Sequence, residues 1–182
     1  GSNYLQMNGS ITLGGQDFTI RGWAQMDVAT AQSWGGLFAL NGNILRIIRY
    51  NTLNDAVEIG YKCNLAKVNL PASLTSRFHF ELDYQHSTGK WFTFFNGVLV
   101  HTYTNSLART TYSNVFVGGN GDNSSGGNKW SGSIDEFQIY DGVALHDSDF
   151  APPTEADYLI DGAAYNVTVD VQRKVHNPPL EW

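Results

Sequence analysis

The chain of 182 residues has few charged side chains, a single cysteine and no long apolar run. Charged residues make up only 15% of the sequence and aromatic residues 13%, a composition that argues against intrinsic disorder. No stretch approaches the roughly 18 consecutive apolar residues of a membrane-spanning helix, so we expect no membrane span. The lone Cys63 excludes a disulfide within the chain.

Basic residues are also few, because 11 Lys and Arg stand against 17 Asp and Glu, for a formal net charge of −6. A polyanionic nucleic acid would be repelled by this balance, and the basic residues are scattered, so we expect no nucleic-acid partner. The first ten residues show no basic region followed by an apolar core, so no signal peptide is visible.

Helical periodicity is nearly absent as well, with one turn at Asp147–Phe150 as the single candidate. Short segments of alternating apolar and polar residues recur instead, separated by turn signals such as Asn96-Gly97. The segments expected to be strands are 4–7, 10–13, 18–26, 36–40, 44–50, 56–61, 67–70, 77–84, 90–95, 98–103, 115–117 and 130–140. Such a series predicts an all-β fold, an antiparallel sandwich or barrel.

The segment Arg77 to Tyr84 (RFHFELDY) has the clearest alternation. Its phenylalanines, leucine and tyrosine are expected to face the core. The side chains between them, His79, Glu81 and Asp83, are expected to face solvent. Glu81 and Asp83 therefore share a face, but a solvated one, which does not favour a catalytic pair.

The composition changes after Pro152-Pro153, and we place a boundary at residue 157. Residues 1–157 are expected to form the main domain, and residues 158–182 a C-terminal strand and tail packed on it. Tyr165–Gln172 alternates strictly within this tail. It either folds back beside the N-terminal strand or links to a missing partner or domain, and we favour the first because its valines need cover.

Five segments in a fixed order resemble one known family. They are FTIRGWAQM, WFTFFNGVLV, FVGGN, WSGSIDEFQIYDGVAL and DGVALHDSDFAPPT. Over about residues 3–157 the chain resembles the laminin-G-like domains of the concanavalin A-like jelly-roll superfamily. The last segment is similar to the endings of such domains in phage tail and bacterial surface proteins.

The resemblance implies a two-sheet antiparallel β-sandwich of the jelly-roll kind. Loops at its edge, or its concave face, would bind glycans or protein receptors, sometimes through calcium. It also implies an extracellular, cell-surface or virion location.

Glucanases of similar fold carry an E-x-D-x-x-E strand motif, but here Asp135 stands next to Glu136. A regular strand sends adjacent side chains to opposite faces, so these carboxylates are not expected to flank one glycosidic bond. We therefore expect no catalytic residues and no enzyme activity. Asp135 shares a face with Phe137 and Ile139, so we interpret it as a buried structural anchor held by backbone N–H groups.

Glycan binding calls for an aromatic platform flanked by amide and carboxylate groups. The candidate residues for this role lie in two loops and are Trp34, Asn120, Asp122, Asn123, Asn128 and Trp130. The alternative for each tryptophan is that it plugs an edge of the sandwich. Asp122 and Asn123 are also the candidate calcium ligands, although both are common turn residues and calcium needs six to eight oxygen donors.

We expect a non-catalytic recognition module for a cell-surface glycan or receptor. The alternative is a structural or assembly domain of a phage tail or surface protein, which would self-associate or contact other such proteins. A glycoside hydrolase ranks last. Calcium is the one cofactor considered.

Overall fold

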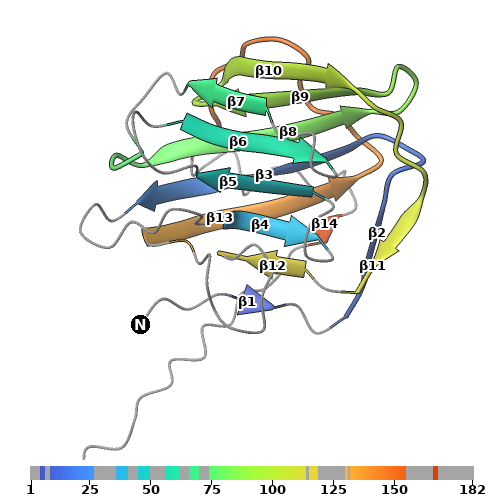
Figure 1. The fold of residues 1–182 in the computed structure, drawn as a ribbon, viewed down its shortest axis with the longest axis horizontal. Coiled ribbons are helices and arrows are strands. Elements are labelled where there is room, and N and C mark those ends of the chain that lie inside the picture. Colours follow the sequence, from blue (N-terminus) through green and yellow to red (C-terminus); the bar gives the residue numbers. More distant parts are fainter. Residues whose placement is uncertain are drawn as a thin grey trace, which may run out of the picture.

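A computed structural model shows two six-stranded antiparallel sheets packed face to face, with a two-stranded ribbon at one side (Figure 1). It describes residues 5–6, 9–26, 36–40, 45–49, 56–61, 66–69, 74–113, 115–118, 130, 132–154 and 166–167. The strands are β1 (Leu5–Gln6), β2 (Ile11–Leu13), β3 (Phe18–Met26), β4 (Gly36–Leu40), β5 (Leu45–Arg49), β6 (Ala56–Tyr61), β7 (Ala66–Asn69), β8 (Phe78–Gln85), β9 (Lys90–Phe95), β10 (Val98–Thr104), β11 (Thr110–Tyr112), β12 (Val115–Val117), β13 (Gly132–Asp141) and β14 (Asn166–Val167).

The first sheet has the order β1-β12-β4-β5-β6-β7, and the second has the order β10-β9-β8-β3-β13-β14. Strands β2 and β11 pair separately. The predicted all-β antiparallel sandwich is thus confirmed. Among the described residues no helix forms, so Asp147–Phe150 is irregular and nothing there is a helix long and apolar enough to cross a membrane.

The core lies between the two sheets and is built by alternate residues of their strands. Phe80 and Leu82 of β8, Ile20 of β3 and Phe38 of β4 are fully buried in it. Burying each such side chain stabilises the fold by about 1.5–3 kcal/mol. Trp91, on β9, is also fully buried.

The opposite face of β8 is not solvated, and this corrects the prediction for His79, Glu81 and Asp83. All three side chains are fully buried. Residues 143–153, which we call the strap, cross this outer face of the second sheet and run from β13 to the β10 edge (Figure 1). The apolar residues of β8 face the core, as the alternation predicts. The polar face of β8 is covered by a segment more than 60 positions away in the sequence, which the alternation could not indicate.

Hydrogen bonds donated by backbone amides fasten the strap along its length. The Leu145 amide donates to Asp83 Oδ1 at 2.8 Å, and the Phe150 amide donates to the Gly97 carbonyl at 2.9 Å. Near the far end, the Leu99 amide donates to Asp149 Oδ1 at 2.8 Å.

A bulge in β13 overturns the expectation that Asp135 is a buried anchor. The register with β3 shifts between Asp135 and Gln138, and Glu136 has a φ of +51°. Such a bulge resets the alternation of the strand. Phe137 consequently faces the core, whereas the Asp135 side chain is 68% exposed.

The described part of the tail is β14, which pairs with β13 through Asn166 and Val167. The tail was expected beside the N-terminal strand, but β1 pairs with β12. The proposed boundary at residue 157 stays a prediction. The remaining tail, Cys63 and the loop residues Trp34, Asn120, Asp122, Asn123 and Asn128 lie outside the described residues.

Candidate functional site

The two loops nominated from the sequence leave the sandwich at neighbouring points. Met26, which precedes the first loop, is the register partner of Gly132, which follows the second. On the other side of the loops, the Gly118 amide donates to the Leu37 carbonyl at 2.7 Å. The bases of both loops are therefore held together at one end of the sandwich by the pairing of β3 with β13 and by this bond.

Trp130 joins these bases and is not an exposed platform. Its amide donates to the Gly118 carbonyl at 2.9 Å, and its indole N–H donates to the Gln25 carbonyl at 3.3 Å. The ring packs edge-on against Phe78, with centroids 6.2 Å apart, and only 4% of the residue is exposed. Trp130 therefore closes the edge of the sandwich as a buried core residue, which is the alternative role stated above. We no longer consider Trp130 a ligand-binding residue.

A second tryptophan lies on the outer face beside this end. Trp23 of β3 is half-buried, and the Arg77 guanidinium lies 4.9 Å from its ring centroid. Arg77 is also 3.4 Å from a carboxylate oxygen of Asp135 and 3.7 Å from one of Glu136. The bulge thus brings both carboxylates to one cation, contrary to the expectation that they face opposite ways.

This Trp23–Arg77 group combines an aromatic ring, a guanidinium and two carboxylates, the kinds of side chain that sugar hydroxyls and pyranose faces contact. A tryptophan inside a strand is more often a core residue, so Trp23 was not among the candidates from the sequence. A signal was present, because Trp23 shares a strand face with polar Arg21 and Gln25.

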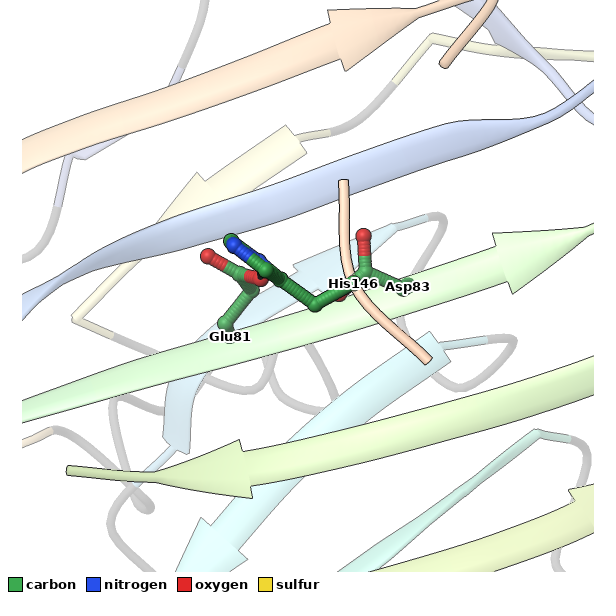
Figure 2. A group of neighbouring side chains, drawn as sticks. All are labelled: Glu81, Asp83 and His146. Carbon is green, nitrogen blue, oxygen red and sulfur yellow. Dashed lines mark hydrogen bonds and ion pairs between the residues drawn. The ribbon is translucent and has the colours of Figure 1, made fainter. Parts of the chain in front are cut away.

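A third group lies under the strap, where Glu81 and Asp83 of β8 meet His146 (Figure 2). His146 Nδ1 lies 2.5 Å from Glu81 Oε1. Asp83 Oδ1 accepts hydrogen bonds from the Leu145 amide and from the Thr19 hydroxyl. The His146 ring stacks on Phe150 at 3.6 Å between centroids, which holds the imidazole over β8.

Burial dominates the electrostatics of this group. It raises the pKa of Glu81 to about 7, against the opposing effects of a hydrogen bond with Asp83 and the charge of Arg21. Burial also raises the pKa of Asp83 well above its usual value, and the negative charge of Glu81 adds to that rise. The pKa of His146 is lowered by burial. Both carboxyl groups therefore take up a proton more readily than exposed carboxyl groups do, and His146 takes one up less readily than an exposed histidine.

Comparison with known proteins shows which family the chain belongs to. A family model described as the concanavalin A-like lectin/glucanases superfamily matches residues 1–149. The chain belongs to this superfamily. A comparison with curated proteins gives no match.

Several solved structures are similar to this chain in fold at low sequence identity. A SAP-like pentraxin from Limulus polyphemus superposes with a TM-score of 0.59 at 13% identity, over 90% of this chain and 84% of the pentraxin. The carbohydrate-binding module of a Ruminococcus gnavus sialidase, bound to α2,3-sialyllactose, gives 0.57 at 14% identity, over 80% and 95%. Domains LG4-5 of the mouse laminin α1 chain give 0.53 at 13% identity, over 85% and 46%.

Proposed function

We propose that the chain is a non-catalytic recognition module that binds a cell-surface glycan at the end of the sandwich where the two loops leave it. The observation that carries this proposal is the joining of the two loop bases through Met26, Gly132, Leu37 and Gly118. Loops held on a rigid β scaffold are where binding residues commonly lie. Trp34, Asn120, Asp122, Asn123 and Asn128 keep their proposed roles in these loops.

We include the Trp23–Arg77 group in the proposed binding surface. Arg77 is 42% exposed on its side chain and lies next to exposed Asp135, so its charge can reach a ligand at the same end. A guanidinium pairs well with the carboxylate of an acidic sugar. Among the described residues Val98 is the single large hydrophobic side chain that is exposed, so a polar ligand suits this part of the surface better than an apolar partner.

The two pairs of carboxylates that were weighed for catalysis support a non-catalytic role. Asp135 and Glu136 are both engaged by Arg77, and Glu81 and Asp83 are sealed beneath the strap. A glycosidase needs two carboxyl groups that reach one bond of the substrate. An extracellular place, on a cell surface or a phage tail, is part of the proposal and is supported by the laminin-like fold and the DGVALHDSDFAPPT segment.

The test is a glycan array probed with the full chain, with and without EDTA, and including α2,3- and α2,6-sialyllactose. We expect saturable binding that is abolished in Trp34→Ala and weakened at least tenfold in Arg77→Ala. Loss of binding in EDTA would support calcium ligation by Asp122 and Asn123. His86→Ala is the control, since His86 is exposed and follows β8 at the opposite end from Phe78.

Absence of saturable binding to any glycan, or equal binding by wild type and both variants, would overturn the proposal. In the first case, self-association in sedimentation experiments would favour the assembly role instead. Hydrolysis of a β-glucan would overturn the non-catalytic assignment.

A further inference from the structure

We propose that Glu81, Asp83 and His146 bind a divalent transition-metal ion of the zinc class, which fastens the strap to the outer face of the sheet. One ligand atom from each residue lies within 4.8 Å of the others. In Figure 2 the His146 ring lies beside the Glu81 carboxylate, and the Asp83 carboxylate lies next to the His146 side chain. This site is separate from the loop end and from the calcium ligands proposed there, and it does not rest on glycan binding.

Two buried oxygens point to a bound cation. Glu81 Oε2 and Asp83 Oδ2 are sealed from solvent, and without a proton shared between the two carboxyl groups neither oxygen has a hydrogen-bond partner. A buried ionised carboxylate without a partner is strongly unfavourable, so each oxygen needs either a proton or a cation. Both oxygens belong to residues that already direct their other oxygen to the strap, Glu81 toward His146 and Asp83 toward Leu145.

The donor set selects the kind of ion. One imidazole nitrogen and two carboxylate oxygens suit zinc and its neighbours, whereas calcium and magnesium prefer oxygen donors alone. The His146 side chain is 31% exposed, so an ion can reach it from solvent.

The surroundings already orient two of the ligands. The Thr19 hydroxyl and the Leu145 amide hold Asp83, and stacking on Phe150 holds the His146 ring. Such supporting contacts are typical of metal ligands. Tetrahedral ligands at about 2.1 Å lie about 3.4 Å apart. Binding therefore requires His146 Nδ1 to move away from Glu81 Oε1, by about 1 Å from the present 2.5 Å.

The competing occupant is a proton shared between the two carboxyl groups. The charged and titratable neighbours bear on this choice: Arg21 and His79 on the sheet, and Asp147 on the strap. Arg21 directs Nε to Gln138 and Nη2 to Tyr140 on β13, and its positive charge opposes a second cation. A shared proton and a metal ion make opposite predictions for Glu81→Gln, because glutamine imitates the protonated acid but binds metal poorly.

The experiment uses the full chain, freed of metal with a chelator, at pH 7.5. Titration with Co²⁺ is expected to give visible d–d absorption that saturates at one equivalent and is displaced by Zn²⁺. Zn²⁺ is expected to raise Tm by several degrees, whereas Mg²⁺ and Ca²⁺ leave it unchanged. His146→Phe keeps a ring to stack on Phe150 and removes the nitrogen, and it should abolish both signals, as should Glu81→Gln.

His101→Ala is the matched control, because His101 is a half-buried histidine on β10 whose ring stacks on Tyr103. It should keep the Co²⁺ absorption. No absorption in the wild type, or full absorption in His146→Phe, would overturn the proposal. A wild type that binds no metal, together with a metal-free Glu81→Gln of higher Tm, would assign the site to the shared proton. Glycan binding is not a readout here, so this result and the array result are independent.

Discussion

At the scale of single residues, backbone conformation decides which way the acidic pair of β13 points. Glu136 has a φ of +51° and its amide donates to Asp135 Oδ1 at 2.9 Å, which fixes the bulge locally. Without the bulge, Asp135 would share the inward face of Phe137. With it, Asp135 and Glu136 both reach Arg77 on the solvent side.

We predict that Asp135→Ala lowers the free energy of unfolding by less than about 1 kcal/mol, because exposed ion pairs contribute little. Its exposed fraction of 68% leaves no buried charge to satisfy. Urea unfolding at pH 7 measures the change, with Asp135→Asn as the companion variant. A loss of 3 kcal/mol or more in both would restore the buried-anchor interpretation.

The burial of His79 affects how the free energy of unfolding depends on pH. The residue is fully buried between the rings of Trp23 and Phe150, neither ring nitrogen has a hydrogen-bond partner, and burial lowers its pKa to about 3. Below pH 6.5 the unfolded chain takes up this proton and the folded chain does not. His79 therefore lowers stability by about 1.4 kcal/mol per pH unit as the pH falls from 6.5 toward 3.

Replacing His79 with Phe removes this titration and keeps an aromatic ring in place. Relative to wild type, His79→Phe should gain stability as the pH falls from 6.5 to 4.5, whatever fixed offset its larger ring introduces. Chemical denaturation at a series of pH values gives the two curves. Parallel curves over this range would show that His79 protonates in the folded state.

At the scale of elements, the strap determines that the outer face of the second sheet is buried and not solvated. It covers the polar face of β8, and it meets the β9–β10 turn at Gly97. That glycine has a φ of +74°, and a Cβ on it would lie 1.9 Å from the Phe150 carbonyl oxygen. Only glycine gives both the turn conformation and the room for the strap.

We predict that Gly97→Ala destabilises the fold by about 2 kcal/mol or more, because the alanine must push the strap away from the turn. Gly142→Ala is the matched control. Gly142 also has positive φ, at +100°, but its Cβ would meet nothing closer than 3.6 Å. Thermal unfolding compares the two variants, and equal losses would mean that backbone strain rather than strap contact dominates.

The sequence predicts features that depend on neighbouring residues, and it does not predict features that depend on contacts between distant segments. Alternation is a local signal, so the strands and the inward face of β8 were predicted from it. The strap over β8 and the pairing of β14 with β13 each join segments that are far apart in the sequence. The bulge at Glu136 depends on the register between β13 and β3. No local sequence pattern predicts these three features. The short strand β11 was missed because its residues, two threonines and a tyrosine, show neither an apolar run nor an alternation.

At the scale of the whole molecule, the two sheets bring together groups with opposite effects on pH stability. Glu81 has a folded pKa of about 7, above its unfolded value of 4.5. Between these values the folded chain holds more protons than the unfolded chain, so stability falls as the pH rises. The pKa of Asp83 is raised in the same direction. His79 acts with the opposite sign, so the two effects partly cancel in the wild type.

Glu81→Gln separates these contributions, and we predict its effect in the presence of EDTA so that no metal is bound. Glutamine cannot lose a proton, so relative to wild type the variant should gain up to roughly 3 kcal/mol between pH 4.5 and pH 7.5. The same pH series of denaturation curves measures it, with Glu136→Gln as the control carboxamide on the solvent side. Removing Glu81 leaves the His79 titration as the main slope, so the variant should lose stability on acidification more steeply than wild type. An unchanged difference across the series would mean that Glu81 ionises at its ordinary pKa, and that the strap does not keep water from the pair.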